Sequence, residues 1–448
     1  MKVQLQTHGV DRESAIAFLR PLPGWIEFET EGKLAPPGGY CICLFEESTR
    51  EVEDAVRESV AAQTLVLCLS MAALKPQATW RLLQSGAGDV IVATEPTGIP
   101  QACARLERWR LVDELLQTEP VAGKLIGKSL AWSRMLRQAV EVARCTDGSV
   151  LVIGESGTGK ELLARLFHDL DKRRNAKDLV TVDCTTIVPE LSGSELFGHE
   201  KGAFTGAFQQ RDGAFAQAHR GTLFLDEVGE LPLPLQAQLL RAVQERTYKR
   251  VGGNAWHTAD FRLVCATNRD LREAVRKGEF RSDLYYRLAS WVFEPPPLRN
   301  RREDILPLAR HFLGPMSDGA ADADDILDDA LAGYLSQREY PGNVRELKQL
   351  ASRIRERHVG PGSYSAADLP EEERARLGEV QPWPDAEFEE SIRRAVESGT
   401  ELKQISQSAN DVAIRNAVQR ENGNLQRAAK RLGVTDRALQ MRRASGRI

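Results

Sequence analysis

The chain has 448 residues, of which 42% are hydrophobic and 28% are charged, and its formal net charge is −4. This composition is that of a folded protein, and the length suits about three domains. It excludes a chain-wide polycation that coats nucleic acid, although not a local basic patch. The N-terminal sequence lacks the apolar run of a signal peptide, and the apolar stretch around Leu65–Leu74 is too short for a membrane span. We therefore expect a cytoplasmic protein with no membrane partner.

Residues 1–100 alternate apolar, strand-like runs with helix-like segments. The predicted strands are Val3–Leu5, Trp25–Phe28, Cys41–Phe45, Leu65–Leu69 and Val90–Ala93. The predicted helices are Arg12–Leu19, Glu51–Val60 and Ala78–Gln84. This alternation predicts a parallel α/β sheet. Residues 101–118 then predict one helix with a single apolar stripe, which either packs on this sheet or serves as a dimerising linker.

A second α/β block begins near Leu125 and contains a glycine-rich loop. The buried strand Ser149–Ile153 precedes this loop, and a helical pattern follows it, as in a phosphate-binding loop. Its backbone N–H groups would hold phosphate oxygens, and Lys160 would reach the β- and γ-phosphates of ATP. The candidate nucleotide-binding residues are Gly154, Glu155, Ser156, Gly157, Thr158, Gly159, Lys160 and Glu161. Glu161 stands where Ser or Thr usually contacts Mg²⁺, so the ion must depend on other groups.

Polar residues follow two later strands of the same block. Asp226 and Glu227 end the strand at Gly221–Leu225, where Asp226 can hold Mg²⁺ and Glu227 can polarise the attacking water. Thr267 and Asn268 end the next strand and are candidate sensors of the γ-phosphate.

Two arginines, Arg281 and Arg287, lie six residues apart on one segment. If both face outward, they can act in trans on the nucleotide of a neighbouring copy. The alternative is that they are ordinary surface arginines.

Several long strings in residues 125–358 match one known family. GESGTGKE stands at 154–161, GAFTGA at 202–207, RGTLFLDE at 220–227 and PGNVREL at 341–347. These strings resemble the AAA+ domain of bacterial sigma-54-dependent transcription activators, also called enhancer-binding proteins. The resemblance implies Mg²⁺-dependent ATP hydrolysis in a hexameric ring that grows from dimers, with the sites between subunits.

The resemblance also implies roles for the candidate residues. Lys160 would bind phosphates, the acidic pair would serve Mg²⁺ and water, and the Thr-Asn pair would be the first sensor. The two arginines resemble the inter-subunit arginine fingers, and Arg345 resembles the second-sensor arginine of a helical lid.

The composition of the GAFTGA motif predicts a surface loop. Its residues are Gly202, Ala203, Phe204, Thr205, Gly206 and Ala207. The glycines favour a mobile tip that exposes one aromatic ring and one hydroxyl group. The family implies that this loop contacts sigma-54 and moves with the nucleotide state. The alternative from the residues alone is a tight surface turn with Phe204 buried.

Asp183 is a departure from the commonest family pattern, which has Asn at this position. In the family, that residue is thought to hold the catalytic glutamate until the partner engages. A carboxylate next to Glu227 would form a like-charge pair and raise at least one pKa. We include Asp183 among the catalytic candidates and still expect hydrolysis.

The C-terminal residues resemble the family's Fis-type helix-turn-helix. Helices are predicted over Asp411–Glu421 and Leu425–Leu432, with a turn at Gly433 and an N-cap at Thr435 before the recognition helix. Residues 411–448 hold nine basic and three acidic residues, which suits contacts with double-stranded DNA. The candidate DNA-binding residues are Thr435, Arg437, Gln440, Arg442 and Arg443. A basic helical dimerisation tail is the alternative.

Residues 1–100 resemble a degenerate response-regulator receiver, most clearly over Trp80–Asp89. Receiver chemistry needs acidic residues after the first and third strands and a lysine after the fifth. Here His8, Glu46 and Glu95 stand at those strand ends. We therefore expect no Mg²⁺-assisted aspartyl phosphorylation, and an unrelated α/β sensor stays an alternative.

The predicted fold class is multidomain α/β plus all-α. The predicted parts are a receiver-like domain at 1–100, a helical linker at 101–122, an ATPase subdomain at 123–294, a helical lid at 295–360, a linker at 361–386 and the helix-turn-helix at 387–448. The predicted function is ATP-driven remodelling of the sigma-54 RNA polymerase closed complex from upstream DNA sites. A repressor that keeps the ATPase fold for assembly only and an AAA+ unfoldase are the alternatives.

Overall fold

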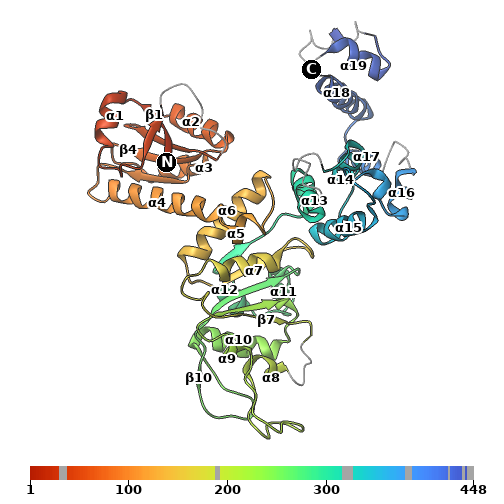
Figure 1. The fold of residues 1–448 in the computed structure, drawn as a ribbon. Coiled ribbons are helices and arrows are strands. Elements are labelled where there is room, and N and C mark those ends of the chain that lie inside the picture. Colours follow the sequence, from red (N-terminus) through yellow and green to blue (C-terminus); the bar gives the residue numbers. More distant parts are fainter. Residues whose placement is uncertain are drawn as a thin grey trace. The chain divides into compact units, whose positions relative to one another are not determined.

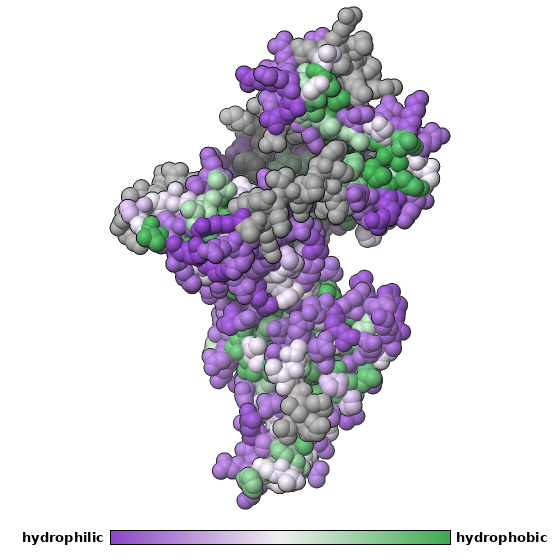
Figure 2. Space-filling view, turned by 90° about the vertical axis from the view of Figure 1, so that its right-hand side faces the viewer, coloured by the Kyte–Doolittle hydropathy of each residue, from purple (hydrophilic) through white to green (hydrophobic). Residues whose placement is uncertain are grey.

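The computed structural model describes residues 1–29, 38–186, 192–314, 326–378, 386–421, 424–435 and 439–440. The chain forms two compact units, Met1–Leu369 and Pro370–Ile448. Among the described residues, no helix is long and apolar enough to cross a bilayer. The face drawn in Figure 2 is mainly hydrophilic, with apolar side chains in small separate groups.

The first sheet is parallel, as the alternating sequence predicts. Its strands run in the order β2-β1-β3-β4-β5. The strands are β1 (Lys2–His8), β2 (Glu27–Glu29), β3 (Tyr40–Phe45), β4 (Leu65–Ser70) and β5 (Asp89–Val92). Its helices are α1 (Arg12–Phe18), α2 (Arg50–Ala61), α3 (Pro76–Gln84) and α4 (Gly98–Leu116). β3 is buried along its whole length, because helices cover both faces of a parallel sheet.

Helix α4 contributes to two hydrophobic cores. Leu106 and Trp109 are buried with the first sheet, and the Trp109 ring stacks on Tyr40 at 6.1 Å. Val112 lies in the other core, next to Trp132 of α6 (Leu130–Cys145). The apolar stripe of this helix therefore packs on its own sheet at one end and on the ATPase block at the other.

The second sheet is also parallel and carries the predicted nucleotide site (Figure 1). Its order is β12-β6-β11-β8-β7. The strands are β6 (Val150–Ile153), β7 (Leu179–Asp183), β8 (Thr222–Asp226), β11 (Arg262–Thr267) and β12 (Trp291–Phe293). The helices of this block, besides α6, are α5 (Glu119–Ala122), α7 (Lys160–Asp169), α8 (Ser192–Phe197), α9 (Ala214–Gln217), α10 (Leu233–Glu245), α11 (Leu271–Arg276) and α12 (Ser282–Leu288). Two short strands, β9 (Thr247–Tyr248) and β10 (His257–Thr258), form a separate antiparallel pair.

A buried ion pair ties this sheet to its helices. Arg262 of β11 has a fully buried guanidinium group, which lies 3.1 Å from Asp171 after α7 and also donates to the carbonyls of Val142 and Ala143 in α6. A buried charge needs such partners, because a lone one is very costly. The composition of the sequence gave no sign of this pair.

A helical lid follows the second sheet. Its helices are α13 (Ile305–Leu313), α14 (Asp329–Gln337) and α15 (Asn343–Arg357), with the 3-10 turns η2 (Leu298–Asn300), η3 (Arg302–Asp304) and η4 (Ala366–Asp368). Their apolar faces form a core of their own around Leu331, Leu347 and Ile354. The lid is thus a small helical body packed behind the phosphate loop.

The second unit consists of helices joined by short turns over its described residues. Its helices are α16 (Glu371–Gly378), α17 (Ala386–Glu397), α18 (Leu402–Arg420) and α19 (Leu425–Leu432). Helix α18 begins nine residues before the predicted start at Asp411, whereas α19 has the predicted bounds. Ala428 and Ala429 are buried against Ile414 and Ala417, so small side chains let α18 and α19 approach closely.

Candidate functional site

The glycine-rich loop joins the end of β6 to the first turn of α7. Gly157 and Gly159 have φ values of +78° and +104°, where a side chain would be strained. Lys160 is 8% exposed, and its Nζ donates to the carbonyl of Gly154 at 2.9 Å. The ammonium group therefore closes the loop from the side where a phosphate group would be held.

Two carboxylates at the end of β8 lie beside this ammonium group. Glu227 Oε1 is 3.4 Å from Lys160 Nζ, and Oε2 accepts the N–H of Asn268 at 2.9 Å. Burial, followed by the negative charge of Glu227, raises the pKa of Asp226. A cation, two carboxylates and a polar sensor thus meet at one sheet edge, as Mg²⁺-assisted attack by water on a phosphate requires.

The donor set fits Mg²⁺ bound together with a nucleotide. Among the described residues, no three His, Cys, Asp or Glu side chains converge as a metal cage. Mg²⁺ in nucleotide sites takes one or two carboxylates, with phosphate and water oxygens as its other ligands. Asp226 offers such a carboxylate, whereas Glu161 is turned to solvent and pairs with Arg165 at 2.9 Å.

Asp183 ends β7 directly opposite Asp226. Its Oδ1 accepts the N–H and the hydroxyl of Thr185, at 2.9 and 2.7 Å. The charge of Asp183 is among the causes that raise the pKa of Asp226. The like-charge effect that the sequence suggested for Glu227 therefore acts on Asp226.

The two residues of the first sensor have different surroundings. Thr267 is fully buried, and its Oγ1 accepts the N–H of Arg269 at 3.1 Å. Asn268 is exposed at the sheet edge, where its backbone holds Glu227. Thr267 is therefore enclosed at the strand end, whereas Asn268 is at the surface beside Glu227.

The lid reaches the loop from its outer side. Arg345 in the first turn of α15 donates to Ser156 Oγ at 2.7 Å. Glu155 is held by Arg299, whose guanidinium group lies 2.5 Å from the carboxylate. The sequence named Arg345 and Glu155 but gave no signal for Arg299.

The two candidate arginine fingers are exposed on the segment around α12. Arg281 pairs with Asp283 at 2.7 Å, and its backbone N–H donates to the buried side chain of Gln236 at 2.9 Å. Arg287 is exposed at the end of α12. Neither side chain is among the groups that surround Lys160 in the same chain.

Residues 202–207 form a closed tip. Gly202 N–H donates to Ala207 O at 2.8 Å, and Ala207 N–H donates to Phe204 O at 3.0 Å. Phe204 is half-buried, with its ring 4.9 Å from that of His199, while Thr205 is exposed. The tip thus combines the tight turn and the exposed hydroxyl that the two interpretations of the sequence had separated.

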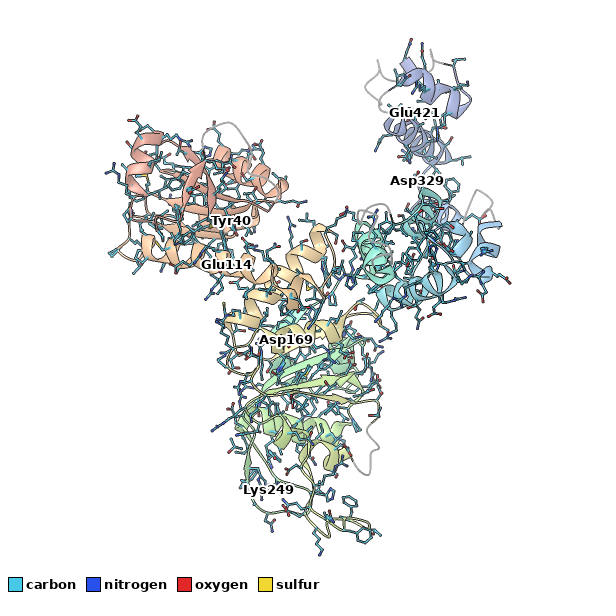
Figure 3. All side chains as sticks on the ribbon, in the orientation of Figure 1. Tyr40, Glu114, Asp169, Lys249, Asp329 and Glu421 are labelled. Atoms are coloured by element: carbon cyan, nitrogen blue, oxygen red, sulfur yellow. The ribbon has the colours of Figure 1, made fainter. Side chains whose placement is uncertain are left out.

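The stem of this loop is joined to the segment between β9 and β10. His199 bridges to both Arg211 and Val251. The loops of this region project from one end of the ATPase block in Figure 1. Lys249, the residue directly after β9, is labelled in this region in Figure 3.

The candidate DNA-binding residues are only partly described. Thr435 and Gln440 are exposed. Arg437, Arg442 and Arg443 lie outside the described residues. Helix α19 is capped by Asn424, whose side chain accepts the N–H of Arg427 at 3.1 Å, and ends at Gly433 with φ +68°.

The first sheet lacks an acidic pair at the end of β1. His8 ends that strand, and its hydrogen bond with the Cys43 thiol is the main cause that raises the pKa of His8. Glu46 follows β3, and Glu95 follows β5. The residues that differ from the receiver pattern therefore lie at the carboxyl edge of the sheet. This is the edge where the phosphorylation site of a receiver would lie.

The candidate catalytic residues lie within one matched region. Residues 125–294 match the family model of the Sigma-54 interaction domain, and residues 299–379 match the AAA+ ATPase lid domain. The regulatory protein AtoC of Escherichia coli is 41% identical over 337 residues, which cover 74% of this chain and 69% of AtoC. The chain belongs to the sigma-54-dependent transcription activators.

Two further likenesses accompany the activator's match to AtoC. The transcriptional regulatory protein ZraR of Klebsiella oxytoca is 42% identical over 337 residues, which cover 75% of this chain and 72% of ZraR. A solved structure of NtrX from Brucella abortus in complex with ADP covers 99% of both chains, with 24% identity and a TM-score of 0.49. The matches to the two family models, to AtoC and to ZraR confirm the predicted family. The two parallel sheets and the helical lid confirm the predicted fold class of α/β plus helical parts.

Proposed function

We propose that this activator binds double-stranded DNA upstream of its promoters, assembles from dimers into a hexameric ring, and hydrolyses ATP with Mg²⁺ to convert the sigma-54 RNA polymerase closed complex into an open complex. The observation that carries this proposal is the position of Glu227, which lies 3.4 Å from Lys160 Nζ and accepts the backbone N–H of Asn268 at 2.9 Å. These groups suit phosphate binding, polarisation of water and sensing of the γ-phosphate.

The proposed ring is supported by the exposed arginines. Arg281 and Arg287 are both exposed on the surface of the ATPase block, and Arg281 pairs with Asp283. An arginine supplied by a neighbour stabilises the charge of the transferring phosphate group. We therefore place the active site between two copies of the chain.

The proposed contact with sigma-54 is supported by the tip at 202–207. Gly202 and Gly206 have φ values of +83° and +103°, so the backbone of the tip turns sharply at both ends. Thr205 is presented to solvent between them. Residues 387–448 carry the proposed DNA contact, since α18 and α19 pack as the first two helices of a helix-turn-helix would.

Replacing the loop lysine tests the proposed mechanism. Lys160→Ala removes the ammonium group that bonds to Gly154 in the loop. ATP-dependent promoter melting by the full-length protein should therefore be lost, while binding to upstream DNA stays unchanged. Lys172→Ala, which removes an exposed lysine beyond α7, is the matched control. A Lys160→Ala protein that still melts promoters would refute ATP-driven remodelling.

A further inference from the structure

Three consecutive carbonyl groups on the outer side of the phosphate loop are bonded to the lid. Each accepts one hydrogen bond: Ser156 from Asn343 Nδ2 at 3.1 Å, Gly157 from the N–H of Val344 at 3.0 Å, and Thr158 from the guanidinium group of Arg301 at 3.1 Å. The lid therefore contacts the backbone of this loop directly.

These bonds fix the direction in which the loop presents its N–H groups. In a trans peptide, the carbonyl group and the next N–H point in opposite directions. The N–H groups of Gly157 and Gly159 therefore point away from the lid. Since such N–H groups bind phosphate oxygens, the lid contacts orient the face of the loop that would receive a nucleotide. The approach is close, because a Cβ at Gly157 would lie 2.2 Å from the carbonyl oxygen of Gly342.

Asn343 is the central side chain of this contact. It is fully buried and has a φ of +52°, a conformation that Asn adopts more readily than most residues. Its Oδ1 accepts the N–H of Leu298 at 2.8 Å, and its Nδ2 donates to Glu155 Oε2 and Ser156 O, each at 3.1 Å. The amide thus links the lid's own backbone to both a side chain and a carbonyl group of the loop.

Glu155 completes the contact from the loop. Arg299 donates to both of its carboxylate oxygens, at 2.8 and 2.5 Å. This pairing, assisted by Asn343, lowers the pKa of Glu155 to about 2. Both charged side chains are well exposed, so the pair adds little to folding stability, and its main effect is geometric. The positive charge of Arg299 also offsets the negative charge of Glu155, which lies in a loop that would bind phosphates.

We propose that Asn343, Glu155 and Arg299 form a latch that positions the phosphate loop, so that contact with the lid sets the affinity of the site for nucleotide polyphosphates. The latch rests on the proposed function only in that residues 154–160 bind a nucleotide. None of the three residues supplies a reacting group, so each is a positioning residue. Breaking the latch should therefore weaken nucleotide binding and leave the chemical step at saturating ATP largely intact.

The test uses the full-length protein with Glu155→Ala, Glu155→Gln, Arg299→Ala and Asn343→Ala. Binding of a fluorescent ADP analogue and steady-state ATP hydrolysis are measured for each. We expect Kd and KM to rise about tenfold for the alanine variants. We expect kcat to change by less than about twofold. The matched control is Arg302→Ala, which removes an exposed arginine from the same lid segment.

Two comparisons separate a latch from general loss of structure. Glu155→Gln keeps an acceptor for Asn343 and should lose less affinity than Glu155→Ala. The double variant Glu155→Ala/Arg299→Ala should bind no more weakly than Glu155→Ala alone, because the loss of Glu155 already breaks the contact with Arg299.

The latch is overturned if Kd for Glu155→Ala and Arg299→Ala equals that of the control, if the two effects simply add, or if kcat falls with KM unchanged. If Asn343→Ala fails to fold, as judged by circular dichroism, the binding data for Glu155→Ala and Arg299→Ala still test the latch. If the unaltered protein does not bind the ADP analogue, the proposed function fails together with the latch.

Discussion

Three carboxylates lie at the ends of the neighbouring strands β7 and β8: those of Asp183, Asp226 and Glu227. Burial first, and then the charges of Glu227 and Asp183, raise the pKa of Asp226. A raised pKa means that this carboxyl group takes up a proton at a higher pH than an ordinary aspartate. Because the charged form is needed to hold Mg²⁺, ATP hydrolysis should decline as the pH falls through this raised pKa.

Asp183→Asn should therefore move the acidic limb of the ATPase pH profile to lower pH. The variant removes one like charge that faces Asp226, which lowers the pKa of Asp226 towards its ordinary value. The measurement is kcat of the full-length protein against pH at saturating ATP and Mg²⁺. Asp178→Asn, which removes an exposed carboxylate near the other end of β7, is the control. An unchanged acidic limb in Asp183→Asn would exclude this electrostatic coupling.

At the scale of elements, the stem that precedes the loop at 202–207 is joined by hydrogen bonds to the segment after β9. The bridges of His199 to Arg211 and Val251 connect the two. Arg250 strengthens the joint, since its guanidinium group donates to Glu200 at 3.1 Å. A displacement of either segment would therefore move the other.

Thr205→Ala should separate ATP hydrolysis from activation. The exposed hydroxyl lies far along the loop from the carboxylates of β8, so hydrolysis should stay within about twofold of the unaltered protein. Binding to sigma-54 in the presence of a transition-state analogue of ATP should be lost. Pull-down of sigma-54 and ATPase rate are measured side by side, with Gln209→Ala, an exposed residue after the loop, as the control. Full activation by Thr205→Ala would contradict the assignment of the loop.

At the scale of the whole molecule, α4 ties the first sheet to the ATPase block. Arg137 of α6 pairs with Asp113 of α4 and donates to the carbonyl of Trp109 at 3.2 Å. Glu141, also in α6, lies 3.5 Å from Arg108. The second half of α4 is thus part of the ATPase core, although it lies in the stretch that the sequence divided from that domain.

This packing predicts where the N-terminal domain can be removed. A protein that starts at Arg110 keeps Val112 in the core around Trp132, whereas one that starts at Val121 loses it, together with Leu115 and Leu116. The shorter protein should unfold at a temperature lower by about 5 °C or more, because several apolar side chains lose their burial. Thermal unfolding followed by circular dichroism measures the difference. Equal midpoints would show that α4 does not stabilise the ATPase block.

Much of the active site was predictable from local sequence. A buried strand, a glycine-rich loop and Lys160 form a continuous segment. Asp226 is the last residue of a strand and Glu227 follows it, so each group lies at the carboxyl edge of one parallel sheet. The bonds of Glu155 to Arg299 and Asn343 were not predictable, since they join residues 144 and 188 positions apart. No spacing rule relates such distant positions.

The sequence by itself determined the family, the fold class and the candidate phosphate-binding residues, because those residues occupy continuous motifs whose backbone conformation is local. Only the tertiary structure decided that Asp183 acts on Asp226, that α4 is shared by two cores, and that the lid bonds to the backbone of the glycine-rich loop. The physical reason is that electrostatic coupling and burial depend on distances across the fold, which residue order does not specify.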